Sequence, residues 1–197
     1  GLPRSGSTLV ESIITMNKDV ADLGEKNIFE EAYNTWKATN KNKEQTSLYE
    51  IYLQKKNNFI DKKISTDKWL FNYQYAGIIA NQIPSAKIIH CYRNPLDNIL
   101  SIYRAHFADG NRYSSSLMDC SKVLINQEFI MNKYKSRYRN NIYDLNYDEL
   151  VSSPKKTIKS LINWLNLSWE ESYLTPHLNP RSVATASTVQ VRSPINP

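Results

Sequence analysis

The first eight residues, GLPRSGST, have the composition and spacing of a loop that binds an anion. Two glycines separated by four residues allow a tight turn whose N–H groups point inward, and an apolar run after Thr8 predicts a helix that starts at this loop. Because a helix N-terminus carries partial positive charge, the loop favours a bound phosphate or sulfate. An NTPase loop has lysine where this chain has Ser7, and the nearest cation here is Arg4. The missing lysine predicts a bound group less charged than a triphosphate, held without a metal ion.

A second group of anion-binding side chains is predicted around Arg93 and Ser101. Residues 86–92 (AKIIHCY) are a near-continuous apolar run, typical of a strand buried in a parallel sheet, and Asn94 and Pro95 then have the residue types that begin a helix. Arg93 and Ser101 are about two helical turns apart, so a strand-end guanidinium and a helix hydroxyl can bind one phosphate. Two separate anion sites indicate a bisphosphorylated nucleotide.

The elements that position these residues alternate between strands and helices. Strands are predicted at 19–24, 64–66, 86–92 and 141–147. Helices are predicted after the first loop, within 29–62 as two helices with a polar link, at 69–82, from Pro95 to about 107, at 122–137 and at 154–165, with loops at 108–121 and from 176. This alternation predicts an α/β domain with a parallel sheet covered by helices on both faces, and ligands at the carboxyl ends of its strands.

Length and composition set wider bounds. A chain of 197 residues predicts one domain with one sizeable core, and its net charge of +6 fits an anionic ligand. Cys91 and Cys120 form no disulfide framework, although a single bridge stays open, and no apolar run reaches the length of a membrane span. The chain opens at Gly1 on a loop that normally follows a buried strand, so we expect a fragment of a longer chain, located in the cytoplasm.

These motifs resemble those of sulfotransferases that use 3′-phosphoadenosine-5′-phosphosulfate (PAPS). GLPRSGST looks like their 5′-phosphosulfate loop, and AKIIHCYRNPLDNILSIYR looks like their 3′-phosphate motif. The segments LGEK, NYDELV, WLNLSW and TASTVQVRSPIN follow in the expected order, most similar to bacterial, often TPR-linked, sulfotransferases that resemble tyrosylprotein sulfotransferase. The resemblance implies a three-layer fold of the P-loop nucleotide-kinase type over residues 1–197, without the first strand and a C-terminal lid segment.

The resemblance also implies residue roles. Glu25 would be the general base toward an acceptor hydroxyl, and Lys68 and Ser187 would stabilise the bridging oxygen and the leaving phosphate. The 5′-phosphosulfate would be bound by Arg4, Ser5, Gly6, Ser7 and Thr8, and the rest of the nucleotide by Arg93, Ser101 and Tyr147. The product would be 3′,5′-bisphosphoadenosine (PAP), with no metal in the site. A second family arginine is not matched in register, so Arg104 is left outside the predicted site.

Other functions stay open from the residues alone. A P-loop kinase would need the lysine that this loop lacks and a carboxylate that binds Mg²⁺. A nucleic-acid-binding protein would need basic residues gathered on one motif, whereas here they are spread along the chain. A non-catalytic module that only binds a nucleotide would behave the same without the Glu25 carboxylate. The histidines His90, His106 and His177 lack metal-ligand spacing, and His106 is a reserve candidate for acceptor binding. The acceptor, whether a protein tyrosine, a glycan hydroxyl or a small metabolite, also stays open, and so does an upstream TPR domain. No nucleic-acid or membrane partner is predicted.

Overall fold

The structure is a computed structural model that describes residues 1–195 except 42–45, 61, 106, 108–110 and 181–190. Its described strands are, in chain order, β1 (Val20–Asp22), β2 (Ile64–Thr66), β3 (Ile88–Tyr92) and β4 (Ile142–Asn146). They form two parallel pairs, β1 with β2 and β3 with β4. The register sets Asp22 opposite Thr66 and Tyr92 opposite Asn146, so the two strands of each pair end side by side. The residues that follow paired strands therefore leave the sheet at a common edge.

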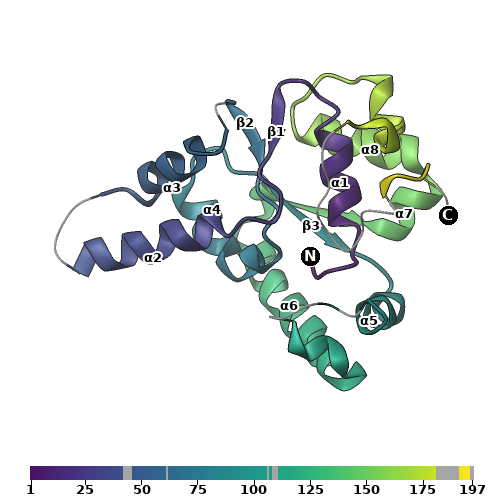
Figure 1. The fold of residues 1–197 in the computed structure, drawn as a ribbon, viewed down its shortest axis with the longest axis horizontal. Helices are drawn as coiled ribbons and strands as arrows, with labels where there is room; N and C mark the ends of the chain where they lie inside the picture. Colours follow the sequence, from purple (N-terminus) through teal and green to yellow (C-terminus); the bar gives the residue numbers. More distant parts are fainter. Residues whose placement is uncertain (42–45, 61, 106, 108–110, 181–190, 196–197) are drawn as a thin grey trace.

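The described helices connect and cover these strands (Figure 1). The α-helices are α1 (Ser7–Ile14), α2 (Ile28–Lys41), α3 (Leu48–Asn57), α4 (Ala76–Gln82), α5 (Pro95–Tyr103), α6 (Leu117–Arg137), α7 (Tyr147–Ser152) and α8 (Pro154–Trp164). Short 3₁₀-helices are η1 (Leu70–Tyr75), η2 (Arg112–Ser115), η3 (Arg139–Asn141), η4 (Glu171–Leu174) and η5 (Pro176–Leu178). None of the described helices combines the length and the apolar character needed to cross a bilayer.

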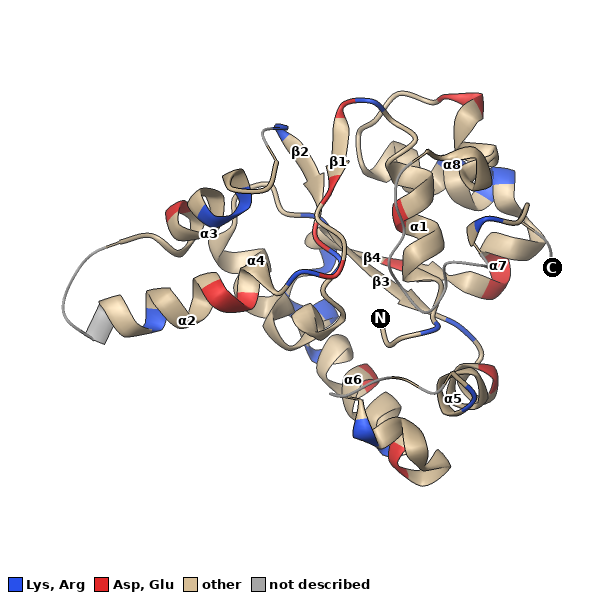
Figure 2. Ribbon diagram, in the orientation of Figure 1, with Lys and Arg blue, Asp and Glu red and all other residues tan. Residues whose placement is uncertain are grey.

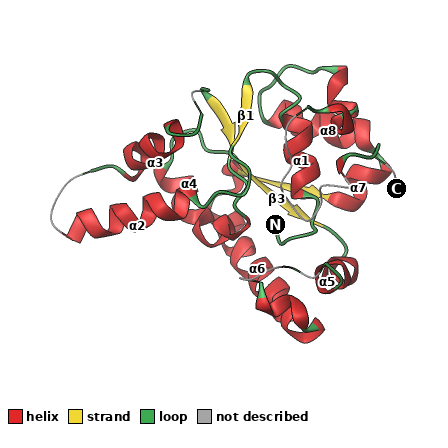
Figure 3. Ribbon diagram, in the orientation of Figure 1, coloured by secondary structure: helices red, strands yellow, loops and turns green. Residues whose placement is uncertain are grey.

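Helices lie on both sides of the β3 and β4 pair, as Figure 3 shows. On one side, Ile13 of α1 and Leu161 of α8 pack with Leu145 of β4 in one buried cluster. On the other side, Met131 of α6 packs with Ile142 of β4, together with Ala76 at the start of α4. Apolar side chains on both faces of a parallel pair require this layered arrangement, and it confirms the predicted α/β class.

Helices α2 and α3 have a hydrophobic cluster of their own. They pack side by side and extend from the rest of the molecule (Figure 1), around buried Phe29, Leu48 and Ile51. Aromatic rings extend this cluster toward η1, and Phe29 lies 5.7 Å from Tyr75 between ring centroids. This cluster shares no residue with the one between α1, α8 and β4.

Several predicted boundaries need correction. The helix predicted to reach about residue 107 ends at Tyr103, and the polar segment predicted as loop to 121 contains η2 and the start of α6. That start is set by Ser116, whose side chain accepts a hydrogen bond from the N–H of Asp119 at 3.2 Å. The first part of the helix predicted at 69–82 is the 3₁₀-helix η1. Both cysteines, Cys91 and Cys120, are buried free thiols.

Candidate active site

The first loop is shaped as an anion cradle. Arg4 and Gly6 both adopt positive φ, 66° and 90°, so the chain turns twice before α1 begins at Ser7. The N-cap residue of this helix is Gly6, which has no side chain to cap it, and the first N–H groups of any α-helix have no partner within the helix. Ser5 is 1% exposed, and its Oγ has no hydrogen-bond partner in the described part of the chain. A buried hydroxyl at the positive end of a helix is suited to an oxyanion.

A pocket of about 420 Å³ lies beside the loop and carries an excess of positive charge. Its walls come from the loop and from one face of α5: Arg4, Arg93, Asp97, Leu100, Ser101, Arg104 and Ala105. Three arginines there face one carboxylate, so an anion of more than one charge compensates the surplus.

Arg4 joins the loop to this pocket. Its Nε donates a hydrogen bond to Ser101 Oγ at 3.1 Å, across 97 residues of sequence. Burial lowers the pKa of Arg4, and the positive charge of Arg93 lowers it further. Two guanidinium groups close enough to repel each other are held together at a cost, which a bound anion removes.

Arg93 lies at the carboxyl end of β3, and Tyr147 follows the paired strand β4. The guanidinium of Arg93 stands over the Tyr147 ring at 4.9 Å, and its Nη2 is 3.7 Å from Asp97. Arg93 Nε is buried and has no hydrogen-bond partner among the described residues. Gly6 also packs closely against this ring: a Cβ built at Gly6 would lie 2.4 Å from Tyr147 Cδ2. Tyr147 is therefore packed against both anion-binding segments.

Two asparagines that the sequence analysis did not place in the site fix α5, Asn94 against α7 and Asn98 against the first loop. Asn94 caps the helix through its side chain, as the sequence predicts, and its N–H donates to Asp148 of α7 at 2.8 Å. Asn98 is 3% exposed and donates from Nδ2 to the carbonyl of Pro3 at 2.9 Å. A signal was available, since Asn94, Asn98 and Ser101 recur at helical spacing and so share one face of α5.

Arg104, which the sequence analysis left outside the predicted site, lines the same pocket. It follows Ser101 by three residues and therefore lies on the same helix face. Its position in the pocket makes Arg104 a further candidate for binding the anion.

Glu25 and Lys68 form an ion pair at the carboxyl ends of β1 and β2. Lys68 Nζ lies 2.5 Å from Glu25 Oε1. The backbone continues the strand pairing to this point, since Leu23 N–H donates to the Thr66 carbonyl and Lys68 N–H donates to the Gly24 carbonyl. Lys68 is 8% exposed, whereas Glu25 is open to solvent. A carboxylate accessible from outside and steadied by a buried ammonium can accept a proton from an incoming hydroxyl.

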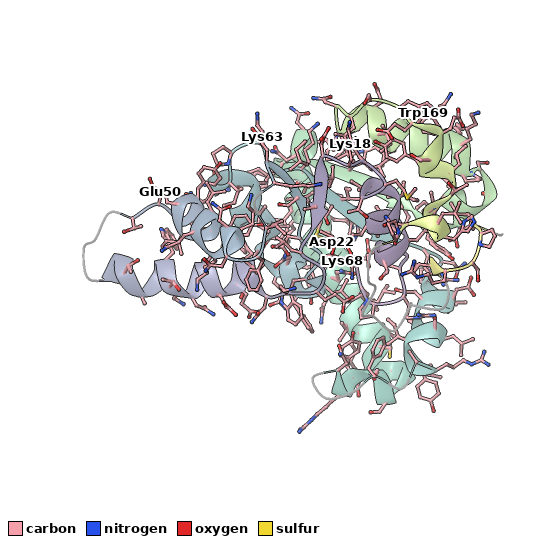
Figure 4. The ribbon with its side chains drawn as sticks, turned by 45° about the horizontal axis from the view of Figure 1, so that its top comes forward. Lys18, Asp22, Glu50, Lys63, Lys68 and Trp169 are labelled. Atoms are coloured by element: carbon pink, nitrogen blue, oxygen red, sulfur yellow. The ribbon has the colours of Figure 1, made fainter. Side chains whose placement is uncertain are left out.

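The ion pair lies close to the anion-binding half of the molecule. Figure 4 shows Lys68 near the centre of the molecule, in the same region as Asp22 of β1. Burial raises the pKa of the Cys91 thiol in β3, and the charge of Lys68 acts in the opposite direction, so the ammonium is within electrostatic range of that strand. A hydrogen bond from Thr66 Oγ1 to the buried carboxylate of Glu11, at 2.9 Å, links β2 to α1. The structure thus brings the predicted base and lysine near the predicted donor loop.

Some predicted positions are not tested by this geometry. Ser187 and His106 lie outside the described residues. His90 lies in the buried strand, as expected, with its ring nitrogens 3.3 Å from Glu128 and 3.4 Å from Asp144. His177 is in η5. The absence of a catalytic metal stays a prediction.

The comparisons with known proteins agree with this geometry. A model of the sulfotransferase family matches residues 1–171. The chain belongs to the sulfotransferase family. A protein of Aquifex aeolicus (strain VF5), described as an uncharacterized protein, is 33% identical to this sulfotransferase over 132 residues, which are 66% of the chain but 17% of that relative. The chain thus spans only a small part of the length of that relative.

A solved structure shares the fold of this sulfotransferase. The sulfotransferase domain from the curacin biosynthetic pathway superposes with a TM-score of 0.65, covering 95% of this chain and 83% of that domain. The sequence identity is 17%, so this likeness shows the fold alone. It confirms the fold class predicted from the alternation of strands and helices.

Proposed function

We propose that this sulfotransferase transfers a sulfuryl group from PAPS to the hydroxyl group of an acceptor. One observation carries the choice of donor: the pocket of Arg4, Arg93 and Arg104 with Ser101, set beside the loop at the start of α1. A donor with a phosphate at each end of its ribose matches two adjoining anion sites. The buried groups Ser5 Oγ and Arg93 Nε, which have no hydrogen-bond partner among the described residues, fit the same donor, because its anionic oxygens would accept hydrogen bonds from both.

Each half of the donor has a separate set of partners in this proposal. The amides of Ser7 and Thr8, with Ser5, hold the 5′-phosphosulfate at the positive end of α1. Arg93, Ser101 and Arg104 bind the 3′-phosphate. Arg4 lies between the two and balances charge on both sides, since it already bonds Ser101. Tyr147 holds the Arg93 guanidinium against its ring.

The transfer step needs a base and a group that stabilises the leaving oxygen. Glu25 takes the proton of the acceptor hydroxyl as the acceptor oxygen attacks sulfur in line; the bond between sulfur and the phosphate oxygen breaks, and PAP leaves. Lys68, with Ser187, stabilises the charge that develops on that oxygen. For this to occur, Lys68 must release Glu25 and turn its ammonium toward the donor. A sulfuryl group carries less charge than a γ-phosphoryl group, so fixed cations and amides are sufficient for it.

Figure 2 bears on the nucleic-acid alternative. Lysines and arginines lie on many elements, with acidic residues among them, rather than on one element alone. Nucleic-acid binding would require a continuous basic surface. The arginine pocket, in contrast, is a local concentration of charge suited to a small anion. Within sulfuryl transfer, the acceptor can be a protein tyrosine, a glycan or a small metabolite.

The test is a calorimetric titration of the full chain with PAP in metal-free buffer, and with ATP and Mg²⁺ in parallel. We expect micromolar binding of PAP, and an affinity reduced about 10- to 100-fold in Arg93→Ala, because each hydrogen bond to a charged group is worth about 1.5 to 3 kcal/mol. The matched control is Arg137→Ala, since Arg137 is an exposed arginine that also stands over a tyrosine ring, that of Tyr138 at 5.6 Å. It removes the same charge far from the pocket and should leave PAP affinity unchanged.

Two results would contradict the proposal. A preference for ATP with Mg²⁺ would indicate phosphoryl transfer. Equal losses of PAP affinity in the Arg93 and Arg137 variants would show that this affinity depends on the overall charge of the protein and not on this pocket.

A further inference from the structure

A carboxylate that the proposed mechanism does not use lies next to Lys68 in sequence. Asp67 accepts three hydrogen bonds from different directions: from Tyr52 Oη of α3 at 3.2 Å, from Asn72 Nδ2 of η1 at 2.8 Å and from the N–H of Trp69 at 3.3 Å. It thereby joins two helices to the end of β2. These three donors come from three different residues, so Asp67 links α3, η1 and the turn after β2.

The neighbours of Asp67 are each held by another element. Thr66 donates to Glu11 of α1, and Lys68 bonds Glu25 through its side chain and Gly24 through its N–H. Residues 66 to 68 are therefore anchored in turn to α1, to α3 with η1, and to the end of β1. The anchor at Asp67 bonds the two residues Trp69 and Asn72 that follow Lys68, so it acts together with the Lys68 N–H bond to Gly24 on the course of the chain at Lys68.

Asp67 occupies this position despite an electrostatic cost. The pKa of Asp67 is raised to about 6. Burial is the largest cause and the negative charge of Glu11 adds to it, whereas the three hydrogen bonds lower the pKa. Burial also raises the pKa of Tyr52, so the phenol remains a donor to Asp67. A polar group retained at a cost, with every donor directed at it, indicates that its acceptor oxygens are needed where they lie.

We propose that Asp67 is a positioning residue for Lys68: by holding Tyr52, Asn72 and Trp69 it fixes the turn after β2, so that the Lys68 ammonium is placed for the transfer step. The inference rests on the proposed function for its catalytic consequence, while the placement of Lys68 can be measured without turnover. Asp67 itself does not contact the reacting atoms in this proposal.

The experiment compares three variants of the full chain: Asp67→Ala, Asp67→Asn and, as a matched control, Asp144→Ala. The amide in Asp67→Asn can still accept from Trp69 and Asn72 through its oxygen and can donate to the oxygen of Tyr52, so it preserves the geometry without the charge. Asp144 also has several partners, including Lys135 and Arg139, but it anchors α6 and η3 to β4 and does not adjoin Lys68. The Asp144→Ala variant therefore shows what the loss of a hydrogen-bonded carboxylate does to the protein when that carboxylate is not next to Lys68.

The first readout is the rate at which acetic anhydride acetylates Lys68, followed by mass spectrometry of the folded protein. Lys68 is buried and paired, so it should react slowly in the unsubstituted protein, in Asp67→Asn and in Asp144→Ala. In Asp67→Ala the rate should rise at least about tenfold, as expected when a buried pair is released by some 1.4 kcal/mol. An unchanged rate in Asp67→Ala overturns the proposal, and so does an equal rise in Asp67→Asn or in Asp144→Ala.

The second readout is PAP release from PAPS with 4-nitrophenol, a tyrosine-containing peptide and N-acetylglucosamine as acceptor probes. The kcat of Asp67→Ala should fall about 100-fold, the typical effect of a small misplacement of a catalytic group, with PAP affinity unchanged. Asp67→Asn and Asp144→Ala should stay within about threefold of the unsubstituted protein, since their geometry at Lys68 is preserved. A normal kcat in Asp67→Ala, or a parallel loss of PAP affinity, refutes the positioning role. Absence of both PAP binding and turnover in the unsubstituted protein instead refutes the proposed function, and the acetylation rates still decide whether Asp67 places Lys68.

Discussion

Replacing Gly6 by alanine tests whether the loop, Tyr147 and Arg93 act as one packed unit. Gly6 has φ of 90°, and an added Cβ would lie 2.4 Å from Tyr147 Cδ2, which is closer than real Cβ contacts allow. The ring cannot retreat freely, because the Arg93 guanidinium stands over it at 4.9 Å. Either the loop or the ring must therefore move, and both belong to the proposed donor site.

The magnitude follows from two costs. The left-handed backbone costs an alanine about 1 to 2 kcal/mol. Forcing a methyl group into a packed contact costs about 1 to 3 kcal/mol more. We expect Gly6→Ala to lower the free energy of unfolding by about 2 to 5 kcal/mol in total. Moving Arg93 out of place should also weaken PAP binding about 10- to 100-fold, the value of one charged hydrogen bond.

Gly24 provides the matched control. Its φ is also positive, at 63°, but no atom of the described residues, apart from its own chain neighbours, lies within 4 Å of a Cβ built there. Gly24→Ala should therefore show only the backbone cost and should bind PAP normally. Urea unfolding and calorimetric titration of both variants separate the two costs. If both variants lose the same stability and bind PAP equally well, the contact between Gly6 and Tyr147 has no energetic weight and the reasoning fails.

Two further predictions concern the acceptor half. Glu25→Gln should lower kcat at least about 100-fold, the usual contribution of a general base, with PAP affinity unchanged in the same titration; a normal kcat would exclude Glu25 as the base. Because burial raises the pKa of Asp67 from 3.8 to about 6, the folded protein holds this proton more tightly than the unfolded chain. The resulting stabilisation is complete below the unfolded pKa and is lost as pH rises through the folded pKa. Between about pH 4 and pH 6.5, the unfolding free energy of the unsubstituted protein should fall relative to that of Asp67→Asn by about 2 kcal/mol, which is the larger part of the full change expected at about 1.4 kcal/mol for each unit of pKa shift; a flat difference in urea unfolding across this range would contradict the shift.

Local signals predicted the donor half well. The glycine spacing and the apolar run placed the first loop at the start of α1, and Asn94 with Pro95 began α5 where the structure has it. These features depend on neighbouring residues, whose preferences can be read directly from a sequence. The position of Arg104 in the pocket was not predicted, although its helical spacing from Ser101 was visible, because register in a resembling family was given more weight than periodicity.

Long-range contacts could not be predicted in the same way. The pairing of Glu25 with Lys68 joins residues 43 positions apart and depends on the register of β1 with β2, which two three-residue strands do not reveal. The 3₁₀ form of η1 likewise follows a turn at which Asp67 bonds Trp69 and Asn72, whereas the apolar pattern alone indicated an α-helix. In both cases particular side-chain bonds, which an apolar pattern does not show, decide between the local alternatives.

The separate hydrophobic cluster of α2 and α3 has a consequence for how this domain can diversify. The buried residues around Phe29, Leu48 and Ile51 are separate from the cluster that supports α1, β3 and β4. Stability effects at sites without shared partners are nearly additive. Mutations in α2 and α3 can thus accumulate without degrading the pocket of Arg4, Arg93 and Ser101. The same boundary marks where two members of the family could exchange segments and each keep its own arginine pocket.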